Sequence, residues 1–108
     1  MTFDDIRKLA LSWPEVEDGT SYGTPALKVK GKLFVRLRPD LDAIVIAASF
    51  EQREQLMAGD PEKYFITDHY RDYAWMLVRL AKVNTDELRD LLRMAHRTAS
   101  VVKPKRAV

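Results

Sequence analysis

The architecture of this chain is clearest from residues 25–38, which read Pro-Ala-Leu-Lys-Val-Lys-Gly-Lys-Leu-Phe-Val-Arg-Leu-Arg. Apolar and basic side chains alternate there with a period near two, on both sides of one glycine. This pattern is typical of a β-hairpin with one apolar face and one cationic face. The stretch holds no acidic residue and five basic ones: Lys28, Lys30, Lys32, Arg36 and Arg38. A sheet with so many cations is expected to face an anionic partner.

The glycine at position 31 predicts a turn over residues 30–32, between strands at 26–30 and 33–38. A turn of three residues preserves the alternation across the hairpin. One face of the hairpin then carries the apolar side chains of Leu27, Val29, Leu33, Val35 and Leu37. The other face carries Lys28 beside Phe34, with Arg36 and Arg38 further along.

The rest of the chain predicts three helices and further strands. Helices are expected over residues 3–12, from Ser49 to about residue 58, and from Asn84 or Thr85 onwards. Strands are expected at 43–48 and 74–80, with short extended pieces within 15–24 and at 64–66. Short loops between the strands favour an antiparallel sheet with helices on one face, which is the α+β class.

The composition predicts one globular domain over residues 1–100 and a basic, flexible tail at 101–108. The net charge of +2 is too small for a protein that only coats nucleic acid, although the start is acidic and the end basic. No segment approaches the ~20 apolar residues that span a bilayer, so no membrane partner is expected. Cysteine is absent, which excludes disulfides and fits a cytoplasmic location.

Two residues of the strand at 74–80, Trp75 and Arg79, are expected to join the cationic face of the hairpin. Aromatic rings would then alternate with cations on an exposed sheet. Nucleic-acid platforms use both residue types, because rings stack on bases and cations neutralise phosphates. The alternative is that Phe34 and Trp75 pack beneath a loop or in a dimer contact, and that the cations are only solvated.

The aromatic segment at 62–73 contains His69 and Arg71 and allows two interpretations. One is a polar recognition loop; its enzymatic version uses His69 as a general base oriented by Asp68 or Asp72. We expect instead a surface loop anchored by its aromatic side chains, because no nucleophile motif accompanies His69. Metal-ligand and phosphate-loop spacings are missing from the sequence, so neither a metal nor a cofactor is predicted.

Three blocks of sequence occur in a recognisable order. Residues 11–18 read Leu-Ser-Trp-Pro-Glu-Val-Glu-Asp, residues 22–35 run from Tyr-Gly-Thr-Pro to Leu-Phe-Val, and residues 69–78 read His-Tyr-Arg-Asp-Tyr-Ala-Trp-Met-Leu-Val. Together they resemble the MmcQ/YjbR family, over the chain up to about residue 100. The family-typical positions are Pro14, Glu15, Gly23, Pro25, Lys28, Gly31, Lys32, Phe34, His69 and Trp75. The chain departs at Ser12-Trp13, where many members have a leucine before the proline, and in its basic tail.

The resemblance implies an α+β fold with a curved antiparallel sheet, whose N-terminal, central and C-terminal helices pack mainly on one face. Such folds are similar to secretion chaperones and to "double-wing" architectures. Members of the family are commonly labelled DNA-binding proteins, a label that rests on structural analogy.

The leading hypothesis is a small, non-catalytic DNA-binding protein with weak, salt-dependent phosphate contacts. The candidate nucleic-acid-binding residues are Lys28, Lys30, Lys32, Phe34, Arg36, Arg38, His69, Arg71, Trp75 and Arg79. The alternatives are a chaperone-like protein-interaction module or a homodimer that buries Trp75, and an enzyme centred on His69.

Overall fold

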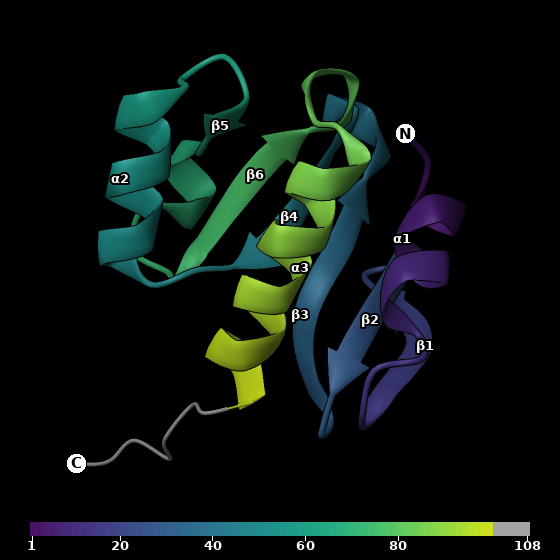
Figure 1. The fold of residues 1–108 in the computed structure, drawn as a ribbon. Helices are drawn as coiled ribbons and strands as arrows, with labels where there is room; N and C mark the ends of the chain where they lie inside the picture. The colour runs from purple at the N-terminus through teal and green to yellow at the C-terminus, as the bar shows by residue number, and fades with distance from the viewer. Residues whose placement is uncertain (101–108) are drawn as a thin grey trace, which may run out of the picture.

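The computed structural model describes residues 1–100, which form a six-stranded sheet and three α-helices (Figure 1). The helices are α1 (Phe3–Ala10), α2 (Phe50–Gly59) and α3 (Thr85–Ser100). The strands are β1 (Val16–Ser21), β2 (Thr24–Val29), β3 (Lys32–Arg38), β4 (Ala43–Ala47), β5 (Tyr64–Phe65) and β6 (Trp75–Arg79). The predicted basic tail at 101–108 lies outside the described residues.

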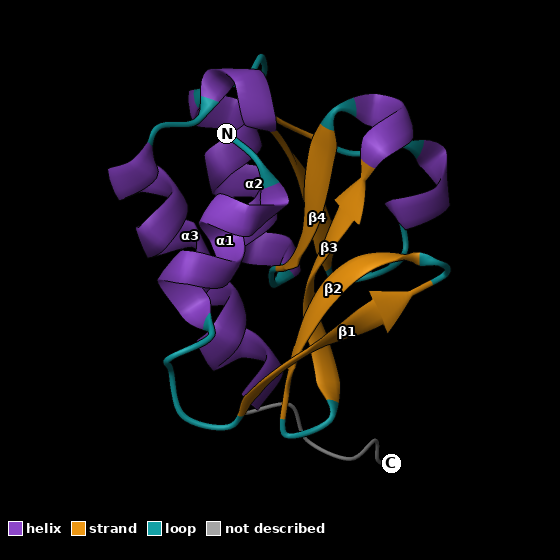
Figure 2. Cartoon of the chain, turned by 90° about the vertical axis from the view of Figure 1, so that its right-hand side faces the viewer, coloured by secondary structure: helices purple, strands orange, loops and turns teal. Residues whose placement is uncertain are grey.

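All neighbouring strands pair antiparallel, in the order β1-β2-β3-β4-β6-β5. The open antiparallel sheet and its helices confirm the predicted α+β class. The two short extended pieces expected from the sequence are β1 and β5, which form the edges of the sheet. Helices α1 and α3 lie on one side of the sheet, which we call the inner face (Figure 2).

Side-chain caps determine where α2 and α3 begin. The Ser49 hydroxyl accepts a 3.1 Å hydrogen bond from the Gln52 backbone N–H, and Gln52 Oε1 accepts one of 2.9 Å from the Ser49 N–H. Asn84 and Glu87 form the same reciprocal pair ahead of α3, at 2.8 and 3.1 Å. These capping boxes satisfy backbone donors that a helix leaves unpaired at its start.

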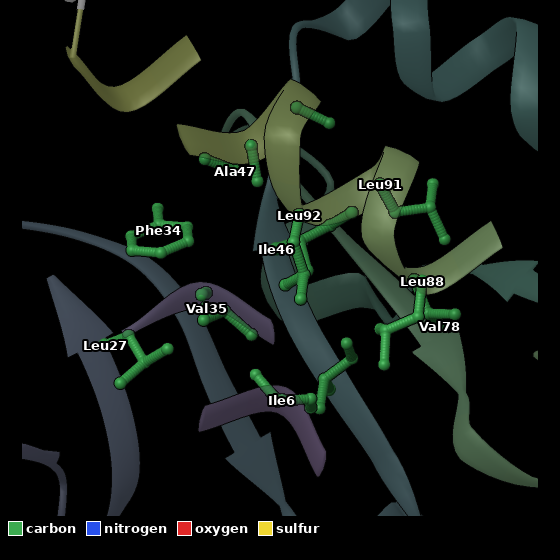
Figure 3. Close-up of a cluster of buried hydrophobic side chains, with 14 of the residues drawn as sticks. Ile6, Leu27, Phe34, Val35, Ile46, Ala47, Val78, Leu88, Leu91 and Leu92 are labelled. Atoms are coloured by element: carbon green, nitrogen blue, oxygen red, sulfur yellow. The ribbon is translucent and has the colours of Figure 1, made fainter. Parts of the chain in front are cut away.

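The main core fills the space between the inner face and the helices. Helix α3 presents an apolar stripe every three to four residues, and α1 adds Phe3, Ile6 and Ala10. Figure 3 shows residues from all these elements meeting in one cluster, among them Ile6, Leu27, Val35, Ile46, Val78, Leu88 and Leu92. Burial of this contiguous apolar surface is the main stabilising contribution to the fold.

The opposite side of the sheet, the outer face, carries a second and smaller apolar cluster. Tyr70, from the segment between β5 and β6, is buried there against Val45 of β4 and Leu77 of β6. This confirms that an aromatic side chain anchors the 66–74 segment to the sheet. The segment therefore covers part of the outer face, and the rest remains open.

The turn between β2 and β3 has two residues, so the prediction of a three-residue turn is wrong. Val29 pairs directly with Lys32, and only Lys30 and Gly31 lie between them. Both adopt positive φ, 53° and 77°. Two successive positive φ angles are the requirement of a type I′ turn, whose twist matches that of the flanking strands.

A β-bulge in β3 compensates for the shorter turn. Lys28 pairs with Leu33, but the next pair is Leu27 with Val35, which leaves Phe34 as an extra residue. Such a bulge inserts one residue into one strand of an antiparallel pair. It therefore shifts the alternation of β3 by one position and restores the parity that the turn changed.

The two-residue turn reverses the predicted faces of Leu33 and Phe34, which precede the point where the parity is restored. Phe34 is fully buried in the main core beside Val35 (Figure 3), with its ring edge-on to that of His96 on α3 at a centroid distance of 5.6 Å. The prediction that Phe34 is an exposed nucleic-acid-binding ring is thus wrong. Leu33 instead turns to the outer face. Beyond the bulge the predicted parity resumes, so Arg36 and Arg38 lie on the outer face as expected.

Candidate functional site

The open part of the outer face is hollowed into a cavity of about 710 Å³, here named the outer-face cavity. Pockets that bind small molecules commonly measure about 300–1,000 Å³. Its lining comes from the β1–β2 turn, from β3, β4 and β6, and from the 66–74 segment. The lining residues are Tyr22, Leu33, Arg36, Arg38, Val45, Thr67, His69, Tyr70, Tyr73 and Trp75.

Arg36 is the cation that this cavity leaves available. Its Nε donates to the Ser21 carbonyl at 3.2 Å and to the Thr24 hydroxyl at 3.1 Å, which fixes the guanidinium beneath the β1–β2 turn. Its Nη1 makes only a long contact of 3.4 Å with the Tyr70 hydroxyl. Within residues 1–100, no carboxylate forms an ion pair with Arg36.

Arg38 has a different role, because its charge is already compensated. Its Nε and Nη2 donate to both oxygens of Asp40, at 3.0 and 2.8 Å. This pairing raises the pKa of the Arg38 guanidinium and lowers the pKa of the Asp40 carboxyl. The remaining Nη1 donates to the Tyr70 hydroxyl at 2.7 Å. Arg38 therefore holds the Tyr70 hydroxyl in place at the floor of the cavity.

Three rings line the rim of the cavity. Tyr22 lies in the β1–β2 turn, where its φ of 53° precedes Gly23 at 78°, and its side chain is 90% exposed. Its ring stacks on the Arg36 guanidinium at 5.1 Å from the centroid. Tyr73 is 59% exposed on the 66–74 segment, where the exposed His69 ring contacts it and meets Tyr70 edge-on. Exposed rings beside a cation favour planar, anionic ligands.

The wall made by the 66–74 segment is held by a buried cation that the sequence analysis missed. Arg53 of α2 is only 7% exposed and stacks on Phe50. Its Nη1 donates to the carbonyls of Tyr70, Tyr73 and Trp75, at 3.0, 2.8 and 3.2 Å. Its Nη2 donates to the Arg71 carbonyl at 2.9 Å. The guanidinium thus supplements the few backbone hydrogen bonds of this irregular segment.

Four of the ten predicted site residues line the cavity: Arg36, Arg38, His69 and Trp75. Lys28 lies on the outer face, opposite Glu17 of β1, but not in the cavity lining. Arg79 also lies on this face, with its guanidinium 4.1 Å from the Phe65 ring centroid.

The other predicted residues are not brought to the cavity. Lys30 is in the turn and pairs with Glu15 at 3.8 Å, and Lys32 pairs with Val29 of the inner face. Arg71 is exposed and pairs with Asp68. Phe34 is in the core, as described above. The five hairpin cations therefore do not form one row.

Three tyrosines complete the cavity but were not among the predicted site residues. Tyr70 and Tyr73 belong to the 66–74 segment. The position of this segment on the sheet depends on Arg53 of α2, which lies 17 residues before Tyr70 and 20 before Tyr73. Tyr22 and Gly23 form a two-residue turn with positive φ at both positions, and the glycine is a local signal for it, since glycine adopts positive φ readily. That signal could have placed Tyr22 at the tip of a hairpin.

The described residues give little support to the other site types. Asp68, one of the two carboxylates named with His69 in the enzymatic interpretation, forms an ion pair with Arg71. Residues 1–100 contain no group of three or more His, Asp or Glu side chains that could hold a metal ion. None of the helices between residues 1 and 100 is long and apolar enough to cross a membrane.

Comparison with known proteins bears on the family and the fold. The chain has the fold of the Deinococcus radiodurans protein DR2400, a crystal structure described with the domain family DUF419, at a TM-score of 0.74 and 21% sequence identity. That likeness covers 88% of this chain and 75% of the other. No curated protein matches this sequence significantly. The YjbR family model matches residues 11–98, and the chain therefore belongs to the YjbR family, as its three sequence blocks predicted.

Proposed function

We propose that this chain is a small, non-catalytic DNA-binding protein that uses the outer face of its sheet. The observation that carries the proposal is Arg36, a guanidinium without a carboxylate partner among residues 1–100, at the floor of an open cavity lined by aromatic rings. A phosphate would meet Arg36, and bases or sugars would contact the rings.

The charge on the outer face supports weak rather than tight binding. Asp40 compensates Arg38, and Asp68 compensates Arg71. The cations of this face without an ion pair in residues 1–100 are Lys28, Arg36 and Arg79. Three phosphate contacts give a log–log salt slope of about −2 on single strands and about −3 on duplex.

Fluorescence anisotropy of labelled DNA tests this proposal. Binding is measured from about 50 to 200 mM salt for the wild-type chain, for Lys28→Gln and for Arg36→Gln. Each substitution removes one phosphate contact, so each is expected to weaken binding and to make the salt slope shallower by about 1. Arg89→Gln on α3 is the matched control, since it removes an exposed cation far from the outer face.

Two results would contradict DNA binding by this face. One is an affinity of the wild-type protein for DNA that does not change with salt concentration. The other is a wild-type affinity in both Lys28→Gln and Arg36→Gln, together with a loss in Arg89→Gln. Lys28 makes no hydrogen bond or ion pair with another side chain among residues 1–100, so its substitution keeps the test valid if Arg36→Gln folds poorly.

A second candidate is a protein-interaction module, and the exposure of Tyr22 and Tyr73 favours it. Tyrosine and arginine are enriched in protein interfaces. Light scattering distinguishes this case, because a stable dimer or complex that buries Trp75, with tryptophan fluorescence unresponsive to DNA, supports a protein partner.

A further inference from the structure

We infer, on the basis of the proposed DNA binding, that the outer-face cavity takes one unstacked nucleotide, so that the ligand is a single strand. A phosphate of that strand lies against Arg36 and Tyr70, and its base stacks on Tyr22. The inference rests on how donors and rings are arranged in the cavity.

The floor of the cavity offers donors for one phosphate. Arg36 uses Nε on Ser21 and Thr24, and its Nη2 makes no hydrogen bond with residues 1–100. The Tyr70 hydroxyl oxygen already accepts from Arg38 at 2.7 Å, so its own hydrogen remains to be donated. Because Arg36 Nη1 and the Tyr70 hydroxyl lie 3.4 Å apart, an anion placed against both would receive charge-assisted hydrogen bonds from each.

The rim offers a platform for a base. One face of the Tyr22 ring rests on the Arg36 guanidinium, and the 90% exposure of this side chain leaves the other face to solvent. A base on that open face extends the stack of guanidinium and ring outward. Stacking on an aromatic side chain stabilises binding for any base, since every base has a π-face. The contact therefore carries little sequence preference.

A duplex cannot use this arrangement. Its bases are stacked on one another, and it offers only its phosphates and groove edges unless a base is flipped out at a cost. The cations without ion pairs on this face are too few to replace the lost stacking with phosphate contacts. Arg38 and Arg71 are neutralised by Asp40 and Asp68. The cavity thus favours a strand whose bases are free.

The test uses the full chain and three labelled probes of about ten nucleotides: a single strand, the matching duplex, and an abasic strand with the same phosphates. We expect the intact strand to bind about tenfold more tightly than either of the others. Tyr22→Leu should lower the affinity for the intact strand about tenfold and should change the affinity for the abasic strand little. Tyr22→Phe keeps the ring and should bind like the wild type. Tyr22 is exposed, so neither substitution threatens the fold.

The outcomes separate this inference from the proposed function. If intact and abasic strands bind equally and with the same salt slope, DNA binding stands and the nucleotide site is overturned. If Tyr22→Phe lowers the affinity for the intact strand as much as Tyr22→Leu does, base stacking is not the source of that affinity and the inference fails. If no probe binds at about 50 mM salt, the proposed function itself fails.

Discussion

At the scale of single residues, Arg53 has more structural consequence than any cation of the hairpin. It gathers four backbone carbonyls of residues 70–75 around one buried guanidinium. Two of those carbonyls, of Tyr70 and Tyr73, also accept backbone hydrogen bonds within the segment, so the guanidinium adds to the few bonds that hold it. The wall of the outer-face cavity therefore depends on a residue that does not line it.

Arg53→Met is expected to lower the free energy of unfolding by about 2–4 kcal/mol, because it removes the four hydrogen bonds that the buried guanidinium donates to carbonyls. Urea denaturation measures the loss. Arg89→Met, on the exposed side of α3, should change stability by no more than about 0.5 kcal/mol. Equal losses in the two variants would show that Arg53 does not hold the segment.

Glu87 makes stability depend on pH in a defined direction. Its pKa lies below the ordinary value of 4.5, mainly because the carboxylate accepts a hydrogen bond from Lys63 and next from the Asn84 backbone N–H. The folded chain therefore binds this proton less tightly than the unfolded chain does. The contribution of Glu87 is present above pH 4.5 and is lost as the pH falls toward the folded pKa.

Glu87→Gln should accordingly lower Tm at neutral pH, and the difference from the wild type should shrink as the pH falls below 4.5. A glutamine side chain can still accept the hydrogen bond from the Asn84 backbone N–H. The comparison therefore isolates the ion pair with Lys63. Glu54→Gln, at an exposed position of α2, serves as the control in the same thermal scans. A Tm difference that stays constant down to about pH 3 would contradict this assignment.

At the scale of elements, the β2–β3 hairpin determines which residues reach the site. A two-residue turn alone would send Arg36 and Arg38 to the inner face, and the bulge at Phe34 returns them to the outer face. The combination of a two-residue turn and a bulge therefore keeps Arg36 and Arg38 on the outer face.

Phe34→Ala tests the inner position of this residue. Removal of a fully buried phenylalanine should cost about 3–5 kcal/mol, as measured by urea denaturation. Tyr73→Ala, at an exposed ring, should cost less than about 0.5 kcal/mol. A Phe34→Ala chain of full stability that binds DNA more weakly would place the ring on the outer face, against this structure.

Gly31→Ala tests the turn. A side chain at φ 77° is strained, and we expect a loss of about 1–2 kcal/mol in the free energy of unfolding. Gly59→Ala is the matched control, because Gly59 ends α2 without a positive φ and a Cβ there meets nothing within 4 Å. Comparable effects at both glycines would argue against a type I′ turn.

The elements were predictable from the sequence because their signals are local. Caps at Ser49 and Asn84, and alternation in the strands, depend on neighbours a few residues apart. The bulge at Phe34 was not predictable, because it depends on the register in which β3 pairs with β2. Arg36, Arg38, His69 and Trp75, which the sequence singled out, line the outer-face cavity, whereas the wall that encloses them depends on the distant contact with Arg53.

At the scale of the whole molecule, the two faces of the sheet have different roles. The inner face is covered by α1 and α3, with Leu56 and Met57 of α2 packed against the same core, and it supplies most of the buried apolar surface (Figure 2). The outer face is only partly covered, and it carries Arg36, which has no carboxylate partner in residues 1–100, beside exposed rings. A ligand on the outer face can bind without disturbing the core.

The most direct measurement of this account is an NMR titration of the ¹⁵N-labelled chain with a short single-stranded oligonucleotide. DNA binding by the outer face predicts chemical-shift changes at residues 21–24 and 67–75, at the Arg36 Nε–H, and around Lys28 and Arg79. Shifts that concentrate instead on α1 and α3, or a spectrum that does not change as DNA is added at low salt, would contradict it.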